Sequence, residues 1–135
     1  MIQHIPLEKI LFLDIETVPQ AGNWEELHET DQYLWDKKTK MQRKEDFTAE
    51  DFYSERGGIM AEFGKIICIS VGILEKSEKL MIKSFSGDDE RKLLEEFGEI
   101  FNHPKLHDVI LCAHNGKEFD FPWIARRFLI NGMQP

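Results

Sequence analysis

The sequence has no long apolar run and few cysteines. No apolar run approaches the roughly 18 residues that a membrane-spanning helix needs. The N-terminus has no basic region followed by an apolar core, so we expect no secretion signal and no membrane partner. The two cysteines, Cys68 and Cys112, both fall inside apolar runs. We interpret them as reduced core residues of a cytoplasmic protein, with no disulfide partner and no zinc site.

The chain also lacks an excess of positive charge, since its formal net charge is −8. This argues against a broad, non-specific nucleic-acid surface. It leaves a nuclease possible, because a metal-dependent active site needs carboxylates and phosphate contacts can be confined to one groove. The simpler interpretation of the acidity is solubility. With 135 residues, 41% of them apolar, residues 1–135 are expected to form a single domain with a real core.

What the sequence does contain is an apolar run, residues 10–17, that ends in two carboxylates, Asp14 and Glu16. A continuous apolar run is typical of a strand that is buried on both faces. Side chains alternate along a strand, so both carboxylates point to the same side. Two unpaired negative charges are costly to bury together, which favours a bound Mg²⁺ or Mn²⁺. The alternative is that the strand simply ends there and both groups face water.

The remaining pattern predicts an α/β fold with a mixed sheet flanked by helices. Residues 23–63, after Pro19 and Gly22, have helical spacing and form a helical insertion after the first strand. Residues 65–74 and 80–85 predict two antiparallel strands, because their linker is too short for a crossover helix. A helix follows residue 88, and a strand at 109–113 is reached through that helix and is therefore parallel to an earlier strand. A last helix begins near Pro122.

The first and fourth strands are expected to be neighbours in the centre of this sheet, so that their carboxyl ends share one edge. Asp120 opens the last helix at that edge and joins the carboxylates of the first strand there. Each residue near it has another explanation. Asp120 is equally suited to be a helix N-cap, His114 to be a buried and satisfied histidine, and Asn115 to form a turn with Gly116.

A basic run lies inside the helical insertion. It comprises Lys37, Lys38, Lys40, Arg43 and Lys44. Such a run is most often a solvated helix face. The functional alternative is a patch that follows a nucleic-acid backbone.

Two motifs carry a family resemblance. Residues 13–17, Leu-Asp-Ile-Glu-Thr, resemble the first motif of the DnaQ-like (DEDD) 3′–5′ exonucleases, and residues 114–122 resemble their second motif. The Asn followed by Phe-Asp is similar to the proofreading domains of family-B DNA polymerases. The whole chain resembles the N-terminal part of a small stand-alone family of predicted exonucleases related to that domain.

The resemblance implies an RNase H-like fold and two-metal hydrolysis of phosphodiester bonds at the 3′ end of single-stranded DNA, with two Mg²⁺ or Mn²⁺ ions. Asp14 would then bridge both ions, Glu16 would complete one site and Asp120 would hold the other. Residues that the resemblance assigns to binding the terminal nucleotide are Asn115 and the backbone near Thr17 and Val18. Phe119 or Trp123 would stack on a base or pack into the core.

The third motif of that family, an Asp with a Tyr or His base, is absent, because residues 121–135 contain no Asp, Glu, His or Tyr. We therefore expect an incomplete catalytic domain without the C-terminal strand and helix of the fold, and with slow or no hydrolysis. Two alternatives remain: a non-catalytic nucleic-acid-binding module of the same fold, and a structural or interaction domain whose carboxylates are incidental.

Overall fold

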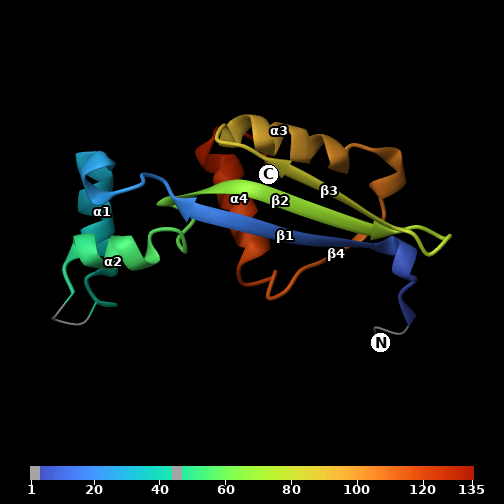
Figure 1. Cartoon of the computed structure of the whole chain (residues 1–135), viewed down its shortest axis with the longest axis horizontal. Coiled ribbons are helices and arrows are strands. Elements are labelled where there is room, and N and C mark those ends of the chain that lie inside the picture. The colour runs from blue at the N-terminus through green and yellow to red at the C-terminus, as the bar shows by residue number, and fades with distance from the viewer. Residues whose placement is uncertain (1–3, 44–46) are drawn as a thin grey trace. The chain divides into compact units, whose positions relative to one another are not determined.

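The computed structural model describes residues 4–43 and 47–135 (Figure 1). Its elements in chain order are η2 (Leu7–Lys9), β1 (Ile10–Pro19), η3 (Trp24–Glu26), α1 (Glu29–Thr39), α2 (Ala49–Arg56), β2 (Gly64–Leu74), β3 (Leu80–Ser86), α3 (Glu90–Phe101), η4 (Pro104–Leu106), β4 (Ile110–Cys112) and α4 (Asp120–Ile130), where η denotes a 3₁₀ helix. The chain divides into two compact units. The first is Met1–Glu16 with Ile66–Pro135, and the second is Thr17–Lys65.

The sheet has the strand order β3-β2-β1-β4. The β2 and β3 strands pair antiparallel, and β1 pairs parallel with β4, as the linker lengths predict. The prediction that β1 and β4 are neighbours is confirmed, but the prediction that both are central is wrong. Among the described strands, β1 and β2 each have a strand on both sides, whereas β4 is a short edge strand. The parallel pairing nevertheless brings the carboxyl ends of β1 and β4 to the same edge.

Both long helices of the first unit pack on one face of its sheet. The Phe85 ring of β3 lies 6.1 Å from the Phe97 ring of α3, and Gly98 of α3 faces the Phe128 ring of α4. An apolar groove of about 830 Å³ between α3 and α4 is floored by Leu13 of β1. The buried side chains that the two helices contribute are Leu93, Leu94, Phe97, Trp123, Ile124 and Phe128.

The expectation that the first strand is buried on both faces is wrong. Exposure alternates along β1: Leu11, Leu13 and Ile15 are buried, whereas Phe12 is 41% exposed. The physical reason is that α3 and α4 both cover the same face, and no described element of the first unit covers the other. An apolar run therefore predicts a strand, but it does not determine whether other elements cover both faces of that strand.

The second unit is mainly helical, as the periodicity of residues 23–63 predicts, and is organised around aromatic rings. Trp35 is fully buried and meets Tyr53 and Phe63 edge-on, with ring centroids 5.4 and 5.0 Å apart. The Tyr53 hydroxyl accepts a hydrogen bond from the Ala21 N–H and donates one to the Ala21 carbonyl. Thr48 caps α2, because its hydroxyl accepts a hydrogen bond from the Asp51 N–H. Whether residues 23–63 are an insertion into one domain stays a prediction.

The cysteines differ from expectation. Cys112 is exposed and Cys68 is partly exposed, so the interpretation of both as core residues is wrong. Cys112 is exposed because all three residues of the edge strand β4 are. Within the described ranges, no helix is long and apolar enough to cross a membrane.

Candidate functional site

The carboxyl-terminal half of β1 presents its acidic residues on the open face of the strand. Asp14 and Glu16 are exposed, whereas Leu13 and Ile15 between them are buried. This alternation is what the two-residue spacing predicts. Both carboxylates are therefore accessible to a ligand, while the backbone that carries them is anchored by the buried residues.

Asp120 is the first residue of α4, and only 4% of it is exposed. The suggestion that it serves as the helix N-cap is wrong, because Phe119 occupies that position and makes no side-chain capping bond. Instead, the Asp120 carboxylate lies beside the backbone N–H groups of Ile15 and of Asp120 itself, which favour its charged form. The start of α4 is thus tied to β1 one residue beyond Asp14.

Electrostatics show that the two aspartates lie close together. Burial raises the pKa of Asp120 above its usual value, and the negative charge of Asp14 raises it further. The two backbone N–H donors and the nearby His114 act in the opposite direction. Because these carboxylates repel each other, a cation bound between them would be favoured by both. Neighbouring carboxylates are expected of a metal site, and perturbed pKa values cluster at functional sites.

The turn between β4 and α4 explains part of the second motif structurally. Asn115 has φ = 52°, a left-handed conformation that Asn tolerates, and its carbonyl accepts from the N–H groups of Glu118 and Phe119. At Gly116 a Cβ atom would lie 2.6 Å from the Cβ of Ala113, so only glycine fits there. The motif therefore builds the turn that delivers Asp120 to the sheet.

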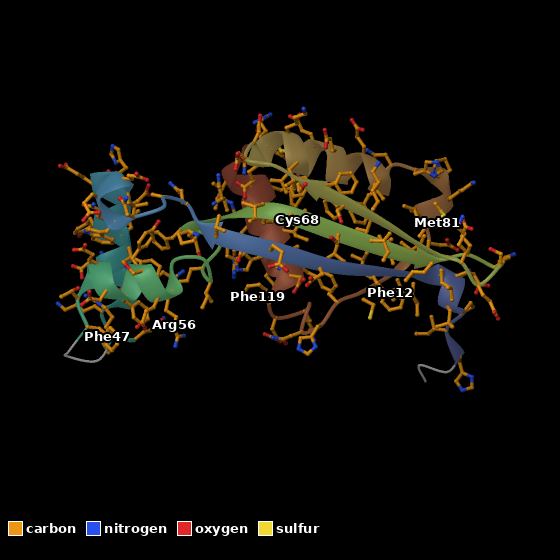
Figure 2. All side chains as sticks on the ribbon, viewed as in Figure 1. Phe12, Phe47, Arg56, Cys68, Met81 and Phe119 are labelled. Carbon is orange, nitrogen blue, oxygen red and sulfur yellow. The ribbon has the colours of Figure 1, made fainter. Side chains whose placement is uncertain are left out.

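Two expectations near this turn have clear outcomes. His114 is exposed, so its interpretation as a buried histidine is wrong. Trp123 is 2% exposed and packs in the core, whereas Phe119, labelled in Figure 2, is only partly buried. The Phe119 ring lies 5.9 Å from that of Trp123. Packing is therefore the role of Trp123, and Phe119 retains a surface that a ligand can reach.

The donor set suits a hard divalent ion, because carboxylate oxygens are the ligands that Mg²⁺ and Mn²⁺ prefer. Across residues 4–43 and 47–135, no three His, Cys, Asp or Glu side chains are grouped closely enough to hold a metal ion. Asp14 and Asp120 are close enough to interact, and Glu16 lies on the same face of β1 as Asp14. The convergence of all three carboxylates stays a prediction.

The basic run in the second unit is partly neutralised. Lys38 pairs with Glu62 at 2.8 Å, and Arg43 pairs with Asp36. Lys37 and Lys40 are exposed on or beside α1. Lys44 lies outside the described residues. Ion pairs thus engage two of the four described members of the run, which leaves two exposed lysines as candidates for phosphate contacts.

Thr17 and Val18 belong to the second unit. The Thr17 hydroxyl donates a hydrogen bond of 2.6 Å to the Gly58 carbonyl, so its side chain already has a structural partner. Both residues are only partly exposed. A contact between their backbone and a nucleotide stays a prediction.

A buried polar cluster in the first unit was not predicted from the sequence. Arg127 of α4 forms an ion pair with Glu90 of α3, and both side chains are less than a tenth exposed. The one available signal was a charged residue inside the apolar stripe of the last helix. Nothing in the spacing indicated its partner, which is 37 residues away.

The fold and this site define a nuclease-like α/β domain. The family model described as the RNase_H superfamily matches residues 51–135, and the chain belongs to that family. The match includes Asp120 but begins after Asp14 and Glu16. The predicted RNase H-like fold is confirmed, as is the relationship to DnaQ-like exonuclease domains at the level of the fold.

Among solved structures, the chain is similar to the family B DNA polymerase from the hyperthermophilic archaeon Pyrobaculum calidifontis. The TM-score is 0.52 and the sequence identity 16%, and the match covers 95% of this chain but 12% of the polymerase chain. No curated protein matches the sequence. The likeness therefore concerns the fold of one small region of the polymerase. Nucleases with the RNase H-like fold generally use divalent metal ions.

Proposed function

We propose that this protein is a metal-dependent 3′–5′ exonuclease domain that acts on single-stranded nucleic acid, with DNA favoured. The observation that carries the proposal is the placement of the buried Asp120 carboxylate against β1, where it is repelled by Asp14. A domain of the RNase_H superfamily with two apposed carboxylates at a sheet edge is suited to phosphodiester hydrolysis.

Each residue has a separate role in this proposal. Asp14, exposed on β1, would hold the divalent ions together with Glu16 for one of them and Asp120 for the other. Divalent ions, when bound, supply an activated water and stabilise the leaving 3′ oxygen. The backbone donors on Asp120 hold its carboxylate in one orientation before any ligand arrives. Asn115, in the same unit as these carboxylates, would position the terminal nucleotide.

Binding of Mn²⁺, followed by electron paramagnetic resonance, tests the metal site directly. The wild-type chain should bind Mn²⁺, and Asp14→Asn or Asp120→Asn should weaken binding at least about tenfold, because each removes one ligand charge. Glu118→Gln is the matched control, since it removes an exposed carboxylate two residues before Asp120. An equal loss of Mn²⁺ affinity in all three variants would mean that the overall negative charge of the chain attracts the ion, without a specific site.

The reaction itself is tested with oligonucleotides labelled at either end. Mn²⁺-dependent shortening from the 3′ end, abolished by Asp14→Asn, would support the exonuclease. A chain that binds no Mn²⁺ but holds single-stranded DNA without cutting it would favour the alternative of a nucleic-acid-binding module that uses the exposed Lys37 and Lys40. Binding of neither Mn²⁺ nor DNA would favour a structural or interaction domain.

A further inference from the structure

The polar cluster around Glu90 connects three elements of the first unit. The Arg127 Nη2 atom of α4 lies 2.6 Å from Glu90 Oε1, and its Nε atom lies 3.0 Å from both carboxylate oxygens. The N–H of Ile66 in β2 donates to Glu90 Oε2 at 2.6 Å. Asn131 adds a donor to Glu90 Oε1 at 2.8 Å. Glu90 thus holds the last turn of α4 and the beginning of β2 at the same time.

The opposite end of α4 has a second polar attachment to the same sheet. There the Asp120 carboxylate lies beside the Ile15 N–H of β1, which favours its charged form. Asp120 and Arg127 are seven residues apart, which is close to two helical turns, so they lie on the same face of α4, about 10 Å apart along its axis. Both residues are less than a tenth exposed. The helix is therefore fastened to the strands near both ends.

The apolar residues between these attachments do not fix the helix in one position by themselves. Burial of Trp123, Ile124 and Phe128 is favourable but non-directional, so small sliding or rotation of α4 changes it little. A forked contact between guanidinium and carboxylate has a definite geometry. The Glu90 carboxylate is itself fixed, because it sits at the first turn of α3 and binds a strand N–H.

We propose that Arg127 is a positioning residue for the active site. By holding the end of α4 on Glu90, it sets the position of that helix on the sheet and keeps the Asp120 carboxylate against the Ile15 N–H, beside Asp14. The inference rests on the proposed function in one respect, namely that Asp120 is taken as a metal ligand. The positioning itself can be measured without any metal.

The test uses the backbone N–H resonance of Ile15 in the metal-free chain, observed by ¹H–¹⁵N nuclear magnetic resonance. Asp120→Asn defines how far this resonance moves when the charged acceptor is lost. Arg127→Met should move it in the same direction, and Arg127→Lys should move it part of the way, because lysine keeps the charge without the fork. Arg126→Met is the matched control on the same helix, since Arg126 is exposed. It should leave the Ile15 resonance unchanged.

Arg127→Met leaves the Glu90 charge buried without a partner and can prevent folding. The double variant Glu90→Gln/Arg127→Met removes both charges together, so no unpaired charge is buried. In this folded variant the Ile15 resonance should move in the same direction as in Arg127→Met. An Ile15 resonance at the wild-type position in this double variant and in Arg127→Lys, with only the stability reduced, would overturn the inference. Arg127 would then stabilise the fold without positioning Asp120.

Mn²⁺ titration of the same proteins separates this inference from the proposed function. If both hold, Arg127→Lys weakens Mn²⁺ binding about tenfold, the scale expected for groups that orient metal ligands. A displaced Ile15 resonance, combined with no Mn²⁺ binding by the wild-type chain, would overturn the proposed function and still support positioning by Arg127.

Discussion

At the scale of single residues, the two apposed aspartates occupy opposite environments. Asp14 is exposed, whereas Asp120 is buried beside backbone N–H groups that favour its charged form. A buried carboxylate that is repelled by another carboxylate works against folding whenever it is ionised. Such a residue is retained most readily where function needs the charge, and its removal should stabilise the metal-free chain.

The first prediction of stability concerns Asp120→Asn. Asparagine keeps an acceptor for the Ile15 N–H but has no charge. The folded-state pKa of Asp120 is raised above 3.8, so ionisation of this group lowers stability as the pH rises through that folded-state pKa. The variant should therefore be more stable than the wild type at pH 7, and the difference should disappear below about pH 4. Urea unfolding at several pH values, without metal, measures it.

Glu118→Gln serves as the control for this experiment, because Glu118 is exposed in the turn just before α4. It should show no comparable pH-dependent gain. A wild-type chain as stable as Asp120→Asn at pH 7 would contradict the stated origin of the shift in the pKa of Asp120.

The sequence predicted the strand pairing at the candidate site better than it predicted the surroundings of the candidate residues. The parallel pairing of β1 and β4 could be inferred from linker lengths, and it brings Asp14 and Asp120 together. The backbone donors on Asp120 and the exposure of His114 could not be inferred, since they depend on the exact course of the turn. The pairing of Arg127 with Glu90 joins two helices across 37 residues, and no local pattern encodes it.

At the scale of elements, sequence patterns predicted the described strands and the helices α3 and α4, and α3 and α4 each bury one apolar stripe. The same patterns did not reveal that one face of β1 is exposed, since this depends on α3 and α4 packing on the same face of the sheet. In the second unit the helices are short, and their stability must come largely from tertiary packing. The aromatic cluster supplies it, with Trp35 in contact with Phe52, Tyr53 and Phe63.

Truncation of Trp35 should therefore unfold or strongly destabilise the second unit. Trp35→Ala removes a fully buried ring and the hydrogen bond that its Nε1 donates to the Ala49 carbonyl. We expect a loss of about 3–5 kcal/mol in the free energy of unfolding. Tyr33→Ala is the control, because this ring on the same helix is 63% exposed, and its loss should change stability by no more than about 0.5 kcal/mol.

Chemical unfolding monitored by circular dichroism measures both variants. Because α1 and α2 lie in the second unit, loss of that unit should also lower the helical signal before denaturant is added. Equal stability of Trp35→Ala and Tyr33→Ala would show that the aromatic cluster does not hold these helices.

At the scale of the whole molecule, charge limits how nucleic acid can be bound. A chain of net charge −8 repels a polyanion unless basic groups are concentrated locally. The basic run is the densest such concentration, but ion pairs with Glu62 and Asp36 already engage Lys38 and Arg43. The exposed Lys37 and Lys40 are therefore the members of the run from which we expect phosphate contacts.

The double variant Lys37→Gln/Lys40→Gln tests this expectation through the salt dependence of single-stranded DNA binding. Each lost phosphate contact should reduce the slope of log K against log salt concentration by about 0.7, so the pair should reduce it by about 1.4 and weaken binding at low salt. Lys76→Gln/Lys79→Gln is the matched control, since both residues are exposed on the turn between β2 and β3. This control removes the same charge, so an equal effect would assign the binding to overall electrostatics. An unchanged slope in the first variant would make the basic run a solvated helix face, and DNA would then have to be held by the carboxylate site and its metal ions.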